Sequence, residues 1–518
     1  MIEIRITKTF AARRDSSPFK LDLAFDAAPG ITVLFGPSGA GKSLTLDDPV
    51  TVAKDLRRDA PERIEAVKQM WADRLPGGKG RDVAREALKS IAWVAANGSK
   101  VRTQTLQILL DDSGDTGHAD TRSMMALMVP IEPDLEIVAF IGATAAANGW
   151  NDLSGPLVRS WARRVPNAKD DARPEQAAFI GLFGAAGMQR AVFDIFATPV
   201  SKDLAGRAVQ RASDARRSAW EVLSRLDPTG AQRAPLLAAL PDGTGDVLVD
   251  GLRACSAEFR CTPTTGSQLR RLERLRDFSE AANKAWWEET SKAIAGIDQA
   301  RTAGIAMRNL EAIRWTATNN PERLNAEKSS LLADLRGQLK GRMTVRRTVG
   351  DISGSSFSKD GLGDWADELS WADLVTIMAV DDAVMATTLR KPMFEQAKRD
   401  EANITTEYGG LLRWKENAGW AVVLYVPRPG GQVDDRRFVA SEEMMADGTR
   451  ALAHYHFHAQ QVFNRDYAGP SPGDYEYAVE QGMPCVVLTP IREGVMNADY
   501  YHTGGVTIDL GDVREVAK

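Results

Sequence analysis

A proline at position 49 limits what the first fifty residues of this chain can fold into. An apolar, strand-like run, ITVLF at 31–35, leads into a glycine-rich loop, GPSGAGKS at 36–43, and only five residues separate that loop from Pro49. Asp48 has the chemistry of a helix N-cap, and proline suits the first helical position because it has no N–H to leave unpaired. We therefore expect a new helix to begin at Pro49, which cuts the helix after the loop to about two turns.

The glycine-rich loop matches the complete pattern GxxxxGK[ST] between a strand and a helix start. Gly36, Gly39 and Gly41 would let backbone N–H groups wrap a phosphate. Lys42 would reach the terminal phosphates, and the Ser43 hydroxyl would hold Mg²⁺. The pattern thus predicts a site for ATP and Mg²⁺, and the alternative is a glycine-rich turn that binds no ligand.

The first 46 residues resemble the start of ABC-type ATPase subunits, especially those of molybdate-type importers. The resemblance stops at Asp48-Pro49, and no LSGGQ-like signature precedes a second acidic strand. The candidate for that strand is LQILLDD at 106–112, from which Asp111 would position Mg²⁺. We therefore expect no ABC-type ATPase activity, while nucleotide binding alone stays open.

Four of the five histidines lie in the last 65 residues, and three of them alternate with aromatic residues in HYHFH at 454–458. In a strand, alternate side chains share one face, so His456 and His458 would lie side by side. Two such imidazoles can chelate one metal ion. Asp474, at the start of a short helix after the turn PSPG, is a plausible third ligand, which leaves a fourth position for water as in catalytic zinc sites.

This constellation resembles the JAMM (MPN+) metalloprotease family over about residues 400–518. The family pattern is a glutamate in an E-x-x-G-x-L-like context, then HxH, then S-x-x-D, and the matching elements here begin at Glu407, His456 and Ser471. The resemblance implies that His456, His458 and Asp474 hold Zn²⁺. It also implies that Glu407 transfers the proton of the attacking water and that the Ser471 hydroxyl supports the oxyanion.

Two departures from the family pattern lie between the second and third elements. Twelve residues separate His458 from Ser471, more than the family pattern has, and Ala459 stands where the family has proline. His454, on the same expected face, is a candidate only for supporting the ligands or contacting substrate. A catalytically inactive relative, or a histidine pair that binds no metal, remains an alternative.

The chain of 518 residues is too long for one core, since single cores rarely exceed ~250 residues. We expect a mixed α and β protein in four segments. The segments are a P-loop segment at 1–48, a largely helical region at 49–345 that forms one or two domains, a linker and helix at 346–399, and a JAMM-like α/β domain at 400–518.

Composition excludes several classes of protein. A net charge of −5 without clustered Lys or Arg argues against nucleic acid as a partner. Three cysteines, none in a CxxC pair, form neither a disulfide framework nor a thiolate zinc site, which favours a cytoplasmic location. No apolar run reaches the ~20 residues of a membrane-spanning helix, so we expect no membrane span.

The leading expectation is a zinc-dependent amide-bond hydrolase, for which the family resemblance implies a peptide or isopeptide substrate. One alternative is an ATP-binding P-loop protein whose C-terminal domain is an adaptor. Another is a non-enzymatic scaffold that binds a protein partner through its helical middle, flanked by degenerate domains. A fused or rearranged reading frame, in which the N-terminal segment has no function, would also explain the loss of ABC character.

Overall fold

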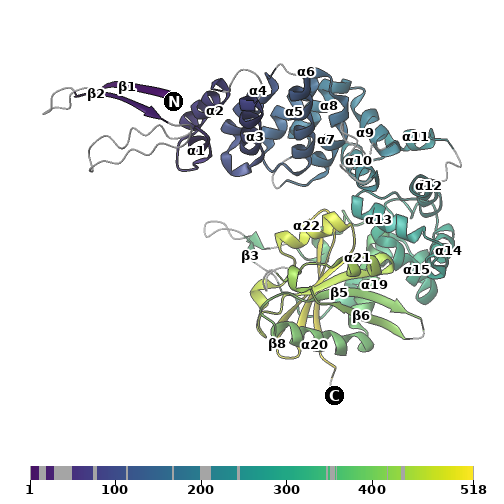
Figure 1. Cartoon of the computed structure of the whole chain (residues 1–518). Helices are drawn as coiled ribbons and strands as arrows, with labels where there is room; N and C mark the ends of the chain where they lie inside the picture. The colour runs from purple at the N-terminus through teal and green to yellow at the C-terminus, as the bar shows by residue number, and fades with distance from the viewer. Residues whose placement is uncertain are drawn as a thin grey trace. The chain divides into compact units, whose positions relative to one another are not determined.

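The computed structural model describes most of the chain (Figure 1). The described residues are 2–10, 19–27, 49–73, 79–112, 115–165, 169–198, 212–241, 246–345, 348–349, 356–357, 359–416, 418–432 and 438–516. The glycine-rich loop at 36–43, with the nucleotide-binding residues expected in it, lies outside them, as does Asp48.

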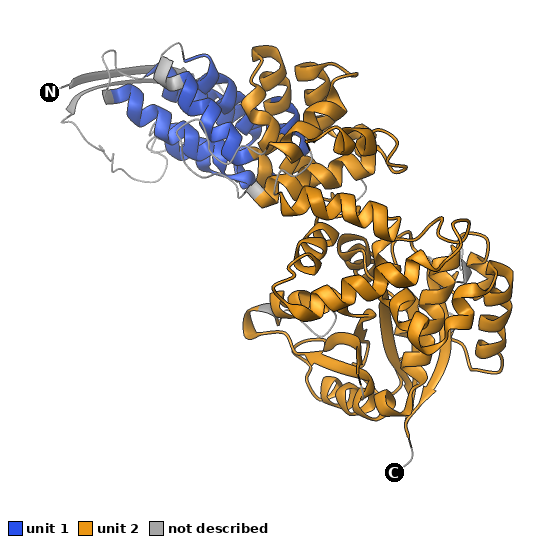
Figure 2. Cartoon of the chain, turned by 90° about the vertical axis from the view of Figure 1, so that its right-hand side faces the viewer, with its two compact units in different colours: residues 1–128, 132–140 blue, residues 129–131, 141–518 orange. Residues whose placement is uncertain are grey.

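The chain divides into two compact units, drawn in blue and orange in Figure 2. Unit 1 comprises residues 1–128 and 132–140, and unit 2 comprises residues 129–131 and 141–518. The described residues form twenty-two α-helices, and a six-stranded sheet lies in the C-terminal part of unit 2. The expected mixed α and β class is therefore confirmed.

Unit 1 contains a hairpin and an array of helices. Two N-terminal strands pair antiparallel from Ile2 opposite Ala27 to Phe10 opposite Phe19. A helix begins at Pro49, as its position predicted. The elements are β1 (Ile2–Phe10), β2 (Phe19–Ala27), α1 (Pro49–Lys54), α2 (Ala60–Ala72), α3 (Lys79–Trp93), α4 (Ser99–Leu110), α5 (Asp115–Met128) and most of α6 (Leu135–Asn148).

The strand expected at LQILLDD is wrong, because residues 99–110 form helix α4. A short apolar run fits a buried helix as well as a strand, and Leu106 and Leu109 are fully buried in the helical core. Asp111 is the exposed C-cap residue of this helix and accepts a hydrogen bond from Gln107 Nε2 at 2.8 Å. The strand-end geometry on which its predicted Mg²⁺ role depended is therefore missing.

Unit 2 begins with a second series of helices. Its helices before the sheet are α7 (Ser154–Ala162), α8 (Pro174–Phe183), α9 (Met188–Ala197), α10 (Ala212–Leu226), α11 (Arg233–Ala238), α12 (Val247–Phe259), α13 (Gly266–Leu275), α14 (Ala281–Ala295), α15 (Leu310–Asn319), α16 (Pro321–Asn325), α17 (Lys328–Leu339), α18 (Leu362–Trp365), α19 (Trp371–Met385) and α20 (Thr387–Glu401). A two-stranded pair, β3 (Thr348–Val349) and β4 (Ser356–Phe357), lies between α17 and α18.

The sheet has the strand order β10-β9-β8-β7-β5-β6. Only β7 and β8 run parallel, and all other neighbours are antiparallel. Its strands and associated helices are β5 (Gly409–Lys415), β6 (Gly419–Tyr425), α21 (Glu442–Asp447), β7 (Ala453–Phe457), α22 (Pro472–Gln481), β8 (Cys485–Arg492), β9 (Val495–Tyr501) and β10 (Thr507–Arg514). The strands expected beyond residue 400 are confirmed.

Helices cover both faces of this sheet, with α22 and α20 on opposite sides (Figure 1). Ala478 of α22 packs in one buried cluster with Cys485, Val487 and Tyr501 of the strands. On the other face, the Tyr455 hydroxyl of β7 donates to Gln396 of α20 at 2.5 Å. Helix α19 is buried along nearly its whole circumference, as an apolar central helix should be.

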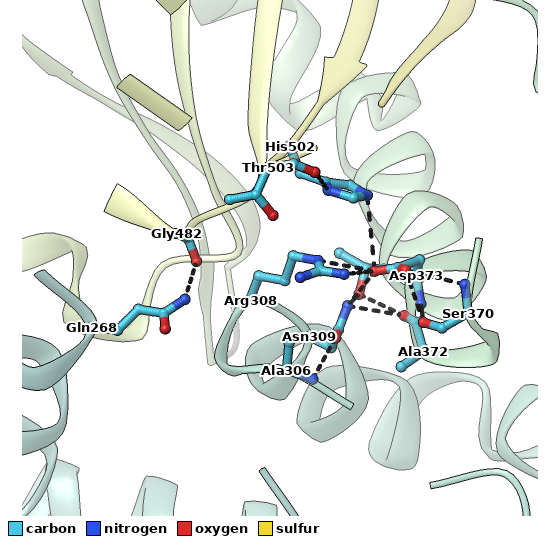
Figure 3. A network of polar contacts seen from close by, with 11 residues as sticks. Gln268, Ala306, Arg308, Asn309, Ser370, Ala372, Asp373, Gly482, His502 and Thr503 are labelled. Carbon is cyan, nitrogen blue, oxygen red and sulfur yellow. Dashed lines mark hydrogen bonds and ion pairs between the residues drawn. The ribbon is translucent and has the colours of Figure 1, made fainter. Parts of the chain in front are cut away.

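A buried polar network joins α19 to the preceding helices and to the end of β9 (Figure 3). Asp373, in the first turn of α19, accepts hydrogen bonds from Arg308 Nε at 3.0 Å and from Asn309 Nδ2 at 3.1 Å. His502 Nε2 lies 4.0 Å from the same carboxylate. Burial disfavours the Asp373 anion, but Arg308 and His502 outweigh it, so the pKa of Asp373 lies below its usual value. These contacts connect α19 both to the segment before α15 and to the end of strand β9.

Among the described residues, no single helix is long and apolar enough to cross a membrane. One helix pair, α8 with α9, meets the length and composition criteria only when its two halves are joined across a bend of 94°.

Candidate metal centre

The pairing of β5 with β7 brings two motifs together that lie about fifty residues apart in the sequence. Gly409 of β5 lies opposite His456 of β7, and Phe457 N donates to Tyr408 O at 3.0 Å just beyond the end of the ladder. In an antiparallel pair this register continues with Glu407 next to His458. The glutamate and the HxH motif therefore meet at one end of the sheet.

The strand predicted from HYHFH is confirmed as β7, and its side chains alternate as expected. His454 and His456 lie on the α22 face, next to Cys485 and Val487 of the parallel neighbour. Tyr455 points to the opposite face, where it contacts α20. The three histidines are 3–8% exposed, so the cluster is buried.

Asp474 joins the two histidines from the first turn of α22. His456 Nε2 and His458 Nε2 lie 3.2 Å apart. Asp474 Oδ1 lies 3.2 Å from His456 Nε2, and Asp474 Oδ2 lies 3.4 Å from His458 Nε2. The two imidazole rings and the Asp474 carboxylate therefore lie in mutual contact.

These separations are of the size found between two ligands of a tetrahedral zinc ion. Zinc–ligand bonds of ~2.0–2.1 Å at tetrahedral angles separate ligand atoms by roughly 3.3 Å. Hydrogen bonds from the two Nε2 atoms to Asp474 can join these three side chains, and so can one cation bound by all of them. A divalent cation at the centre would satisfy all three, so these residues fit zinc.

The loop between His458 and Ser471 orients the second histidine. His458 Nδ1 donates a hydrogen bond to Tyr467 O at 2.8 Å, and its Nε2 faces the cluster. Asn464 Nδ2 donates to His458 O at 2.8 Å and holds the start of the same loop. The residues between His458 and Ser471 therefore hold the His458 ring in place.

Glu407 lies beside the histidine pair and is 2% exposed. One carboxylate oxygen of Glu407 and one ring nitrogen each of His456 and His458 lie within 4.8 Å of one another. Gln460 Nε2 donates to Glu407 Oε1 at 3.3 Å. A carboxylate at this separation can reach a water next to the metal position, or can bind the metal itself.

Ser471 and Asp474 form a capping box at the start of α22. Ser471 N donates to Asp474 Oδ2 at 2.7 Å, and Asp474 N donates to Ser471 Oγ at 3.3 Å. Burial opposes ionisation of Asp474, but His456 and His458 outweigh it and hold the pKa of the carboxyl well below its usual range. The same two histidines therefore favour the anionic form of Asp474. The Ser471 hydroxyl can still donate its proton elsewhere.

His454 lies one step along the same face but takes no part in the cluster. Its Nδ1 lies 2.7 Å from the Tyr477 hydroxyl in a hydrogen bond. Burial, and secondarily Arg271, lowers the pKa of His454 to about 3, so the ring is neutral at physiological pH. His454 is therefore a neutral side chain in the wall of the neighbouring cavity, and its expected supporting or substrate-contacting role stays a prediction.

A cavity of about 490 Å³ opens beside the cluster. His456 and Asp474 line it, together with Ser471 at the start of α22. The remaining lining residues are Phe438, His454, Tyr455, Gly473, Glu476, Tyr477, Glu480 and Tyr501. This volume lies within the range of pockets that bind small ligands, so the cavity could hold a few side chains of a bound peptide.

Several contributors to the site were not predicted from the sequence. Gln460, Tyr467 and Tyr477 act through contacts that no short motif records. Only Gln460 could have been identified from the sequence. It follows the HxH motif by two residues, where a glutamine side chain can reach back to a neighbouring strand. The others depend on how distant segments pack.

Comparisons of this chain with protein-family models, with curated proteins and with solved structures found no match.

Proposed function

We propose that this protein is a zinc-dependent amide-bond hydrolase of JAMM-like type. The observation that carries the proposal is the convergence of His456, His458 and Asp474 at mutual distances of 3.2–3.4 Å, with Glu407 next to them and a cavity beside them. This combination supports a hydrolytic centre more than a structural metal site, because three protein ligands leave a fourth position open.

In the proposed reaction each residue has a role that follows from its chemistry. Zinc, when bound, would supply a Lewis acid and a water of lowered pKa, near ~7. Glu407 takes a proton from the attacking water as the water oxygen bonds to the amide carbon. As the C–N bond breaks, Glu407 returns that proton to the leaving amine. The Ser471 hydroxyl is available to donate to the developing oxyanion.

Metal analysis of the purified full-length protein tests the proposal. We expect about one zinc per chain in the parent and none in the double variant His456→Ala/His458→Ala, because two of three ligands are gone. His118→Ala, on α5 in the other unit, should retain zinc. A parent protein that binds no zinc when supplied with it would refute the proposal.

ATP binding at the glycine-rich loop is a second and independent proposal, favoured by the complete match of GPSGAGKS. ATP at about a hundred times its Kd would stabilise the folded protein by about 2.7 kcal/mol. We therefore expect ATP with Mg²⁺ to raise the Tm of the parent by several degrees and to leave Lys42→Ala unchanged. An unshifted parent would contradict the prediction.

A further inference from the structure

A second cavity lies next to the cavity beside the candidate metal centre, and three arginines of one helix line it. It has a volume of about 320 Å³ and shares Phe438, His454, Tyr477 and Glu480 with the cavity beside the metal centre. Arg270, Arg271 and Arg274 line its α13 side. The two cavities are therefore neighbours separated by the His454–Tyr477 hydrogen bond.

Three long-range hydrogen bonds fix α13 against the sheet domain. Gln268 Nε2 donates to Gly482 O at 3.0 Å, just after α22 (Figure 3). Arg271 Nε donates to Thr449 O at 2.8 Å, and Arg274 Nη1 donates to Met445 O at 2.7 Å. The arginine-lined wall is therefore part of the packed structure, held at three points along the helix.

The positive charge on this wall is not neutralised within the described part of the chain. None of the three arginines forms an ion pair with a carboxylate there. Arg270 is exposed, Arg274 keeps donors beyond the one given to Met445 O, and Nη2 of the buried Arg271 has no hydrogen-bond partner. Arg270 and Arg274, four residues apart, also repel each other on one helix face.

Two carboxylates, Glu442 and Glu480, line the same cavity, so its charge is not uniform. Neither forms an ion pair with the α13 arginines among the described residues. The arginines outnumber these carboxylates and lie together on one helix, whereas Glu442 and Glu480 belong to α21 and α22. The α13 side of the cavity therefore favours an anion.

We infer that this cavity binds a carboxylate of the substrate, so that the enzyme selects peptides with an acidic residue close to the scissile amide. Arg270 and Arg274 are the residues that would contact the carboxylate, since guanidinium groups bind carboxylates through paired N–H donors. Arg271 is buried, lines the same cavity and adds positive charge to it. This inference rests on the proposed hydrolytic function for its link to cleavage, while carboxylate binding itself does not.

Binding is measured with the full-length Glu407→Gln variant, in which cleavage does not consume the probe. The probes are a fluorescein-labelled glutamate homopeptide and a glutamine homopeptide of equal length, followed by anisotropy. We expect the acidic peptide to bind at least about ten-fold more tightly, since hydrogen bonds to charged groups contribute about that factor or more. The preference should vanish in Arg270→Gln/Arg274→Gln and persist in Arg336→Gln, an exposed arginine of α17.

Cleavage is measured separately, with the zinc-loaded parent acting on a peptide mixture whose cut sites are read by mass spectrometry. Enrichment of Asp and Glu beside the cut sites, lost in Arg270→Gln/Arg274→Gln, supports the inference. Cleavage without acidic enrichment overturns the inference and leaves the proposed function intact. If no cleavage occurs but binding depends on the arginines, the proposed hydrolytic function is overturned and the carboxylate-binding site stands. If both homopeptides bind equally well, the carboxylate-binding site is overturned.

Discussion

Replacing Glu407 with glutamine will lower kcat/KM for amide hydrolysis by about 10²–10⁴-fold, the usual contribution of a general acid–base group, while zinc stays bound. The amide has the shape of the carboxylate, and its oxygen can still accept the hydrogen bond from Gln460. It cannot take a proton from water at neutral pH. The effect should therefore fall on the chemical step, and kcat should fall more than KM changes.

The measurement combines initial rates of peptide cleavage with zinc content and Tm of the same preparation. Because one Glu407 oxygen lies within 4.8 Å of both ring nitrogens, the carboxylate could be either a proton carrier or a ligand. Full zinc content with a lost rate identifies it as the proton carrier. Loss of zinc in Glu407→Gln would instead make it a ligand, and an unchanged rate would exclude both roles.

The parts of this site that short-range chemistry determines could be predicted from the sequence. The alternation in HYHFH requires only the period of a strand, and β7 has it. The turn PSPG predicted a short helix after it, and α22 ends with Gly482 in the left-handed region at φ 61°. Proline at 49 predicted a helix start for the same local reason.

The parts that depend on long-range packing could not be predicted. The five-residue run LQILL is too short to distinguish the two-residue period of a strand from the 3.6-residue period of a helix. Burial against neighbouring helices favours the helix α4 at this segment. The α13 arginines alternate with buried leucines in GSQLRRLERL, a pattern common to amphipathic helices. Their contacts with Thr449 and Met445 cross more than 170 residues of sequence, so nothing near them in the chain indicates a cavity.

A second large effect is expected from Gly410→Ala, at the glycine of the E-x-x-G element. A Cβ at Gly410 would lie 2.0 Å from Val423 O of β6 and 2.9 Å from the Tyr455 hydroxyl of β7. The first of these is a backbone atom, so β5 can accommodate the methyl group only by moving away from its neighbour. We expect a loss of about 3 kcal/mol or more in the free energy of unfolding, at the upper end for overpacking.

The matched control is Gly430→Ala, in the same domain, where a Cβ would meet no atom within 4 Å. That variant should keep its Tm, or gain slightly, because alanine lowers the entropy of the unfolded chain. Thermal unfolding followed by zinc analysis links the strand to the site. Glu407 lies two residues before β5, and β5 pairs with β7, so Gly410→Ala should also weaken zinc retention. An unchanged Tm would mean that β5 does not lie between β6 and β7, and the register that joins Glu407 to the histidines would fail with it.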